Sequence, residues 1–510
     1  MTRKRGVTPL VIAPRRDALT RSAGILLHPT SLPGPYGIGS LGADARRFVD
    51  FLADSGMGLW QTLPLGPNGY ADSPYAGLSA FAGNPLLIDL DLLHRENLID
   101  AHDLDNIPEA GTSSVDFGRI IPAKMAMLRR ACQKFVRGRE ARRGSFETYV
   151  ASNGAWLEDY ALFMALKDAH SNVAWDVWDA GVRKRDPKAL EQARVELAAG
   201  IEFHRFTQFV FDQQWTALRT YAHDKGISIV GDMPIFVAYD SADVWSGQGQ
   251  FRLDADGRPE FVAGVPPDYF SATGQLWGNP HYRWERMQKA GFSWWVERFR
   301  ALLNRVDIIR LDHFRGFAAA WWVLYGSETA ETGTWVRSPG AEIFTATQAA
   351  LGEIPIIAED LGLITPDVVE LRDRFGFPGM KILQFAFDKD LDSTSLPHNF
   401  TRNTCVYTGT HDNDTSIGWF KSLSRSENTR VCRYLNTPGK DIAWDLMRIG
   451  FASVADRALA PMQDILRLGP EARMNRPGTV EGNWQWRFSW DQVASTLSAD
   501  LRSLAETYGR

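Results

Sequence analysis

The sequence is poor in cysteine, nearly balanced in charge and free of long apolar runs. Its three cysteines, Cys132, Cys405 and Cys432, are too far apart to form a CxxC unit, so we expect neither a disulfide framework nor a thiolate zinc site. The net charge of −5 argues against broad contact with a nucleic-acid backbone. No apolar stretch approaches the roughly 20 residues that span a bilayer. The run at residues 7–13 is too short for a signal peptide and is broken by Pro9. These features predict a soluble cytoplasmic protein that binds neither nucleic acid nor membrane.

Hydrophobic and aromatic residues are plentiful, at 44% and 12% of the 510 residues. Short apolar runs recur between helical patterns, as is typical of parallel strands buried on both faces. About eight such units predict an α/β protein, a (β/α)8 TIM barrel with helix-rich insertions; a doubly wound open sheet is the alternative. The eight runs are residues 24–28, 59–65, 227–237, 306–312, 354–359, 380–387, 405–410 and 459–466.

The chain divides unevenly between these runs. Residues 1–22 are basic and lack periodicity, so they predict a loose N-terminal tail. We expect residues 23–510 to form the catalytic barrel. Two long intervals between predicted strands suggest inserted subdomains, a helix-rich one at about residues 67–200 and a glycine- and aromatic-rich one at about 241–292.

Carboxylates stand at or near the ends of four of the predicted strands: Asp232, Asp312, Glu359 and Asp412. A TIM barrel carries its active site at this edge. Each acid alone is compatible with a helix cap or a solvated loop. Like charges buried together raise the pKa of at least one of them. Glycoside chemistry uses such a set, with one ionised carboxylate as nucleophile and one protonated acid for the leaving oxygen.

Basic and imidazole side chains flank these acids. Arg310 lies two residues before Asp312, so on a strand both point the same way and the cation favours the ionised acid. A structural ion pair is the alternative for Arg310. His313 and His411 are placed to donate to sugar hydroxyls or to be satisfied rim histidines. With no HxH or HExxH motif and no cysteine ligands, we expect no metal site.

Two loops combine aromatic rings with small polar side chains. They are residues 70–85, with Tyr75, and residues 266–280, with Tyr269, Phe270 and Trp277. Rings can stack on a pyranose face while polar groups bind its hydroxyls. The alternative is packing beneath a long loop. Glycine and proline bracket the second loop, so it is a candidate lid or hinge.

From Ser22 to about Phe488 the sequence resembles the 4-alpha-glucanotransferases called amylomaltases or disproportionating enzymes, glycoside hydrolase family 77. The motifs follow one another in the family's order. They are AGILLHPTSLPGPYGIGSLG (23–42), DSPYAGLSAFAGNP (72–85), GDMPIFV (231–237), GVPPDYFSATGQLWGNPHY (264–282), IIRLDHFRGF (308–317), IIAEDLG (356–362), YTGTHDNDT (407–415) and PGTVEGNWQWR (477–487).

The resemblance implies roles for the acids and their neighbours. Asp312 matches the family's nucleophile, Glu359 the acid/base, and Asp412 the third carboxylate that binds the sugar and stabilises the transition state. Arg310 and His411 match supporting residues around the −1 sugar. Four residues fall in segments that line the family's glucan channel: Tyr75, Asp232, Trp277 and Asn483. Two residues, Tyr269 and Phe270, fall in the family's lid loop over the acceptor side.

The resemblance also implies the reaction. A segment of an α-1,4-glucan moves from a donor to the 4-hydroxyl of an acceptor glucose or maltooligosaccharide by a retaining double displacement. No cofactor, metal or organic, is implied. Two alternatives are a hydrolase of the same glucans and a non-catalytic glycan-binding protein. With near-neutral charge and no coiled coil, we take a monomer as the default.

Overall fold

All eight apolar runs form strands of one closed parallel barrel in the computed structural model, which describes residues 21–105, 107, 113–138, 143–267, 271–387 and 393–510. The barrel closes because β1 pairs with both β2 and β12, so the open-sheet alternative is wrong. Around the barrel the order is β1-β12-β11-β10-β9-β6-β3-β2. The strands are β1 (Ser22–Leu26), β2 (Leu59–Gln61), β3 (Ser228–Pro234), β6 (Ile308–Asp312), β9 (Ile356–Ala358), β10 (Gly379–Ile382), β11 (Thr404–Tyr407) and β12 (Arg457–Pro461).

Several strands end before their apolar runs do. Residues 383–387, at the end of one run, form a 3₁₀ turn, and residues 462–465, at the end of another, form a short helix. The first strand, β1, instead begins before its apolar run, which starts at residue 24. Ser22 already pairs with Arg457 in β1, so it is not part of a tail. The rest of the predicted tail, residues 1–20, lies outside the described residues.

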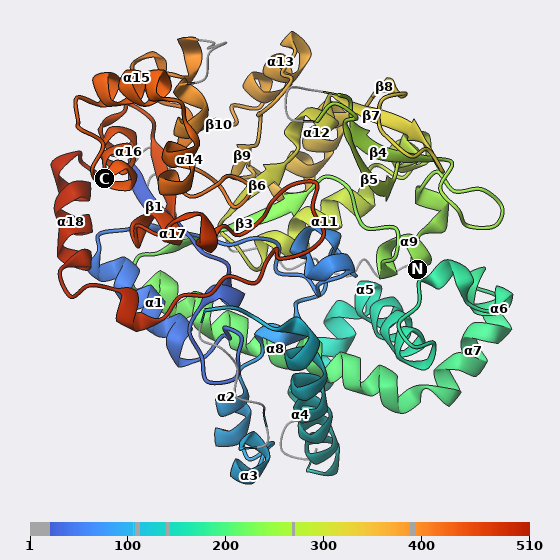
Figure 1. Cartoon of the computed structure of the whole chain (residues 1–510). Helices are drawn as coiled ribbons and strands as arrows, with labels where there is room; N and C mark the ends of the chain where they lie inside the picture. The colour runs from blue at the N-terminus through green and yellow to red at the C-terminus, as the bar shows by residue number, and fades with distance from the viewer. Residues whose placement is uncertain (1–20, 106, 108–112, 139–142, 268–270, 388–392) are drawn as a thin grey trace.

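Helices follow the strands around the barrel (Figure 1). Helix α8 buries Phe203, Phe206 and Trp215, and the chain then turns at Gly226, with φ 77°, shortly before β3. The helices are α1 (Ala43–Asp54), α2 (Leu90–Arg95), α3 (Ala101–Leu104), α4 (Phe117–Arg137), α5 (Arg143–Ala169), α6 (Ala180–Arg183), α7 (Pro187–Glu196), α8 (Ala198–Asp224), α9 (Ala242–Ser246), α10 (Trp284–Lys289), α11 (Ser293–Leu303), α12 (Gly340–Leu351), α13 (Pro366–Arg374), α14 (Ser416–Ser422), α15 (Arg425–Leu435), α16 (Ile442–Ala452), α17 (Met462–Ile465) and α18 (Leu497–Thr507). None of the helices within the described ranges combines the length and apolar character needed to cross a membrane.

The interval predicted as helix-rich holds α2 to α7, which lie in the lower part of Figure 1. The second interval holds α9, α10 and two strands of a sheet that the sequence analysis did not anticipate. This antiparallel sheet has the order β5-β4-β7-β8. Its strands are β4 (Phe261–Val265), β5 (Gln275–Pro280), β7 (Ala319–Leu324) and β8 (Thr334–Arg337). Residues 275–280 are therefore a strand, although the sequence analysis assigned them to a loop.

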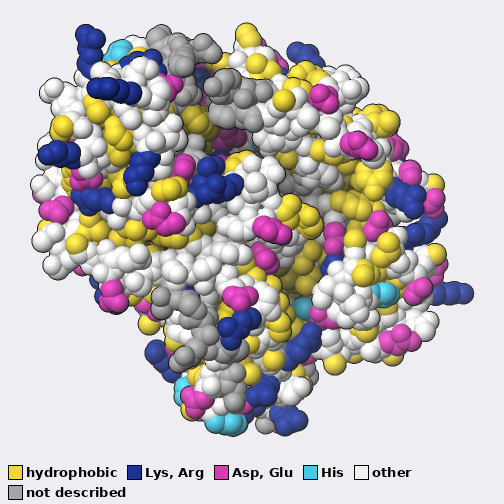
Figure 2. All heavy atoms as spheres, in the orientation of Figure 1, with side chains coloured by type: hydrophobic (Ala, Val, Ile, Leu, Met, Phe, Trp, Pro, Cys, Tyr) yellow, Lys and Arg dark blue, Asp and Glu magenta, His cyan; other side chains and the backbone are white. Residues whose placement is uncertain are grey.

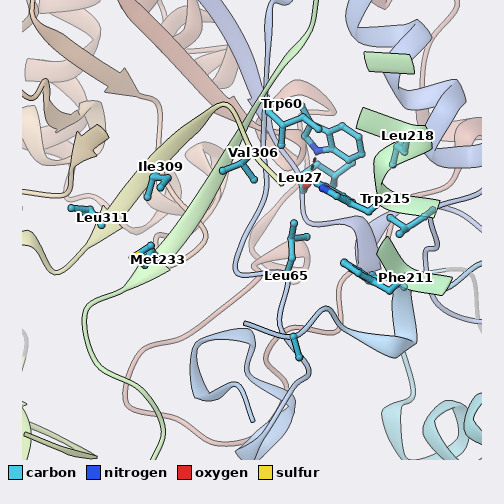
Figure 3. Packing of buried hydrophobic residues seen from close by; sticks show 14 of the residues in the cluster. Leu27, Trp60, Leu65, Phe211, Trp215, Leu218, Met233, Val306, Ile309 and Leu311 are labelled. Carbon is cyan, nitrogen blue, oxygen red and sulfur yellow. Dashed lines mark hydrogen bonds between the residues drawn. The ribbon is translucent and has the colours of Figure 1, made fainter. Parts of the chain in front are cut away.

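Part of the largest hydrophobic cluster packs between the barrel wall and α8, where Figure 3 labels Trp60, Trp215 and Leu218. Trp60 of β2 and Trp215 of α8 are almost fully buried there, and each indole N–H finds a backbone carbonyl: Trp60 donates to Leu27 at 2.8 Å and Trp215 to Arg305 at 2.9 Å. Because each buried indole N–H has a hydrogen-bond partner, burial of these rings leaves no polar group unpaired and stabilises the wall. A rigid wall in turn fixes the strand ends that carry the acids.

The barrel interior changes from apolar to polar along its axis. Alternate residues of a strand face the same side, so Val230 and Ile308 start two inward-facing rows. Val230 lies in an apolar interior cluster, and Ile308 packs against it. Two residues further on, these rows continue with Asp232 and Arg310, which are partners in the register of β3 and β6. The alternation of side chains along β3 and β6 therefore places Asp232 and Arg310 at the polar end of the barrel interior.

Candidate functional site

A buried guanidinium joins the acids of β3 and β6. Arg310 donates from Nη1 to Asp232 Oδ2 at 2.7 Å and Oδ1 at 2.9 Å, and to Asp312 Oδ1 at 2.9 Å. The Asp232 side chain is fully buried, whereas that of Asp312 is 28% exposed. Burial raises the pKa of Asp232, and the charge of Arg310 opposes this rise. Burial likewise disfavours the charged guanidinium, but the two acids outweigh it and raise the pKa of Arg310 well above its usual value. A fixed positive charge therefore lies beside Asp312.

Glu359, directly after β9, is held against the end of β6. Its Oε2 accepts from the backbone N–H of His313 at 2.7 Å, and its Oε1 accepts from Leu361 N–H at 3.1 Å. His313 has a left-handed backbone with φ 50°, a conformation that bulky residues rarely adopt. Burial, and then the negative charge of Asp312, raise the pKa of Glu359 well above its ordinary value. Asp312 therefore lies beside a fixed positive charge, whereas the surroundings of Glu359 favour its protonated form.

Asp412 and His411 lie on the loop after β11. Asp412 Oδ1 accepts from Asn475 Nδ2 at 2.6 Å, and its Oδ2 is 3.3 Å from His411 Nε2. The Asp412 side chain is 44% exposed, so it faces open space, while His411 is buried. The sequence analysis did not identify Asn475. It lies just ahead of the motif that begins at Pro477, and only the folded loop brings it to Asp412.

Tyr75 connects the first aromatic loop to this centre. Its hydroxyl donates to Asp232 Oδ2 at 2.8 Å, and its ring stacks on that of His411 with centroids 5.0 Å apart. Trp484, which the sequence analysis also missed, lies 5.7 Å from the Tyr75 ring. Two contacts therefore hold the Tyr75 side chain in place: its hydroxyl binds Asp232, and one face of its ring stacks on His411.

The remaining predicted binding residues have different settings. Trp277 of β5 is 37% exposed and meets the His313 ring edge-on at 4.8 Å. Asn483 is buried and uses its amide inside its own loop, accepting from Arg476 N–H at 2.9 Å and donating to Thr479 O at 3.0 Å. Tyr269 and Phe270 lie outside the described residues.

Several of these residues line one groove with a volume of about 1270 Å³. Asp232 and Arg310 are buried beneath it, and Glu359 binds the backbone of His313, which lines it. Figure 2 shows hydrophobic side chains bordering a hollow near the centre of the molecule. The predicted residues that line the groove are Tyr75, Trp277, Asp312, His313, His411, Asp412 and Asn483. An open groove of this volume fits an extended ligand such as an oligosaccharide.

The segment that supplies part of the groove wall is clamped to α8. Gln208 exchanges two hydrogen bonds with the backbone of Gly83, at 2.7 and 2.9 Å. Gln214 does the same with the backbone of Asp89, at 2.7 and 3.1 Å. The intervening residues, which include Asn84 and Leu86 of the groove wall, are thus held at both ends.

The acid Asp464 of α17 fastens the loop that carries His411 and Asp412. It is almost fully buried and accepts from Thr408 Oγ1 at 2.6 Å and from Ser416 N and Oγ, both at 2.7 Å. Thr408 and Ser416 stand at the two ends of the loop, so one carboxylate closes it. Sequence patterns gave no signal for this acid, because its partners are about 50 residues away.

We predict that Asp464→Asn loosens this loop. An amide has only one acceptor oxygen, so the variant leaves a buried donor unpaired, which costs about 1–3 kcal/mol. Thermal unfolding should show the loss of stability, and kcat should fall because Asp412 is less well fixed. The exposed acid Asp491 provides the control, and Asp491→Asn should change neither quantity. An unchanged unfolding temperature for Asp464→Asn would contradict the role assigned to this acid.

One group of possible metal ligands occurs in the described part of the chain, at Asp100, His102 and Asp103. It is not among the residues that line the groove. Asp100 binds Lys134 at 2.6 Å and Asp103 binds Arg130. The two acids therefore already have cationic partners, and we assign no metal to them.

Comparisons with a family model, with curated proteins and with solved structures all match this chain to 4-alpha-glucanotransferases. The model of the 4-alpha-glucanotransferases, glycoside hydrolase family 77, matches residues 27–493. The 4-alpha-glucanotransferase of Thermus thermophilus is 48% identical over 501 residues, which are 96% of this chain and 99% of the relative. That of Solanum tuberosum, described as chloroplastic/amyloplastic, is 44% identical over 98% of this chain and 88% of its own. The solved amylomaltase from Streptococcus agalactiae in complex with acarbose has a TM-score of 0.93 at 40% identity, covering 96% of this chain and 99% of that one.

Proposed function

Because the chain belongs to the 4-alpha-glucanotransferase family, glycoside hydrolase family 77, and therefore acts on α-1,4-glucans, we propose that it transfers glucan segments by a retaining double displacement at Asp312 and Glu359. Family membership sets aside the alternative of a non-catalytic glycan-binding protein. The observation that carries the proposal is the contrast between the two acids. Asp312 has a guanidinium at 2.9 Å, whereas burial and the charge of Asp312 favour the protonated form of Glu359.

In the first step Asp312 attacks the anomeric carbon of the donor sugar. The bond from that carbon to the glycosidic oxygen breaks, and Glu359 gives its proton to the departing oxygen. The first glucan fragment leaves with a new hydroxyl, and the other stays bound to Asp312 as a glycosyl ester. Arg310 stabilises the negative charge of Asp312 before attack.

In the second step the acceptor replaces the leaving fragment. Glu359, now ionised, removes the proton from the 4-hydroxyl of an acceptor glucose or maltooligosaccharide, and that oxygen attacks the anomeric carbon. The ester bond to Asp312 breaks, which restores both acids. Two inversions retain the α configuration, and retention predicts carboxyl groups about 5–5.5 Å apart.

The other groove residues have binding roles in this proposal. Asp412, exposed to the groove and fixed by Asn475, is placed to accept from hydroxyls of the −1 sugar. His411 is placed to donate to the same ring, and Trp277 provides a partly exposed ring for stacking. Tyr269 and Phe270 as a lid over the acceptor side stay a prediction, as do a monomeric state and a cytoplasmic location.

Transfer requires that an acceptor sugar compete with concentrated water at the glycosyl ester. A groove that continues past the acids can supply this advantage, since a bound acceptor has its hydroxyl already in position. An amylase-like hydrolase would share the acids and lack the acceptor contacts.

A product assay with maltotriose and labelled glucose separates the two reactions. We expect a ladder of longer maltooligosaccharides, with label entering at the reducing end of the products, because the acceptor glucose is extended at its 4-hydroxyl. Chromatography of the mixture gives both readouts. Accumulation of only glucose and maltose, without labelled oligosaccharides, would show that water is the acceptor and would contradict the proposal.

A further inference from the structure

A second, much smaller cavity is lined by His411, which also lines the sugar groove. It has a volume of about 10 Å³, which is close to the space that one water molecule needs. It forms where β1 and β12 end and where the loop after β11 passes over them. The residues around it are Leu26, Leu27, His28, Ser31, Leu63, His411, Pro461, Gln463, Met474 and Trp486.

Three polar atoms of residues around this cavity are buried without a partner among the described residues: His28 Nδ1, Ser31 Oγ and His411 Nδ1. Each of the three residues is at most 5% exposed. Buried nitrogen and oxygen atoms are almost always hydrogen-bonded, because leaving them unpaired is unfavourable. Three such atoms, on residues that line one small cavity, indicate a shared polar partner.

The protonation of the two imidazoles limits what that partner can be. Burial, aided by the neighbouring His411, lowers the pKa of His28 to about 3, and burial also lowers the pKa of His411. Both rings are therefore neutral near pH 7, each with one N–H and one lone pair. If Nε2 of His411 carries the proton, its Nδ1 is an acceptor and needs a donor. A water molecule offers two donors and two acceptors, so it can serve all three atoms at once.

We propose that this cavity binds one water molecule that donates to His411 Nδ1 and thereby holds His411 in the tautomer with N–H at Nε2. The Nε2 atom of His411 lies 3.3 Å from Asp412 Oδ2. At this position its N–H can donate to a sugar hydroxyl. His28 and Ser31 are then positioning residues, which act through the water and not on the substrate. Fixing a ring by a partner on its far nitrogen is a general device for histidines at functional sites. The proposal rests on the proposed contact of His411 with the sugar.

Ser31→Val tests the site by filling it. The two methyl groups take the space of the water, and the hydroxyl is lost. We expect kcat on maltotriose to fall about tenfold with KM changed less than twofold, because a misoriented His411 fails mainly at the transition state. Ser31→Ala keeps room for the water and should lose only two- to threefold. Ser55, equally buried and also without a partner for its hydroxyl among the described residues, gives the matched control. Ser55→Val should leave kcat unchanged.

Two measurements on the wild-type enzyme decide the question even where Ser31→Val does not fold. A high-resolution crystal structure should show a water within hydrogen-bond distance of all three atoms. The ¹⁵N spectrum of histidine-labelled enzyme, with His411 assigned through His411→Gln, should show the Nε2–H tautomer. A dry cavity, an Nδ1–H tautomer, or a Ser31→Val variant with wild-type kcat would each overturn the proposal. These outcomes are independent of whether Asp312 proves to be the nucleophile.

Discussion

Replacing Asp312 by asparagine should lower kcat for the disproportionation of maltotriose by about 10⁴-fold or more, the scale seen when an enzyme loses its nucleophile. The amide keeps the size of the side chain but cannot form the glycosyl ester. Arg310 should stay in place, because Asp232 still holds it with two hydrogen bonds. Release of glucose from maltotriose measures the loss, and calorimetric binding of maltotriose should remain within a few-fold of wild type.

Asp491→Asn is the matched control, since this acid is exposed and is not among the residues that line the groove. It should retain full activity. The unfolding temperature of Asp312→Asn should also stay close to that of wild type, which would exclude loss of fold as the reason for inactivity. Turnover of Asp312→Asn near the wild-type rate would remove Asp312 from the nucleophile's role.

The barrel could be predicted from the sequence because its strands are buried on both faces. Such strands consist of near-continuous apolar residues, as in residues 354–359, and their carboxyl ends gather at one edge. The contact of Arg310 with Asp312 was predictable for a similar reason, since a spacing of two on a strand fixes a common side. Periodicity alone left an open sheet as the alternative, because closure depends on the pairing of Ser22 in β1 with Arg457 in β12, far along the chain.

The second sheet and several site contacts could not be predicted, because they depend on pairing between distant segments. β5, with Gly278 at φ 79°, has the glycine content of a loop and becomes a strand only beside β4. Asn475 and Trp484 reach the site through the fold of their loop alone. Asn483 is among the residues that line the groove, and only the structure shows that its amide is engaged within its own loop.

Glu359→Gln should lower kcat/KM on maltotriose by about 10²- to 10⁴-fold, the usual contribution of a general acid. The glutamine has no proton to give to the glycosidic oxygen. A donor whose leaving group needs no proton, such as maltosyl fluoride, should therefore restore most of the first step. Added azide, which attacks the glycosyl ester without a base, should restore the second step and form an α-glycosyl azide.

The pH dependence gives an independent readout of the same group. The wild-type reaction starts with Glu359 protonated, and burial together with the charge of Asp312 raises its pKa well above the ordinary value. Activity on maltotriose should therefore persist at pH values where an ordinary glutamate has lost its proton. It should then fall as the pH rises through this raised pKa. Glu359→Gln with maltosyl fluoride and azide should lack this alkaline decline, since no proton transfer by residue 359 remains.

Glu353 offers the control for both readouts. It is an exposed glutamate just before β9, whereas Glu359 comes just after the same strand. Glu353→Gln should keep the wild-type rate and the wild-type pH profile, because Glu353 is exposed and is not among the residues that line the groove. If Glu359→Gln lost activity equally on maltotriose and on maltosyl fluoride with azide, the defect would lie in binding or folding. Glu359 would then not be the acid that protonates the leaving oxygen.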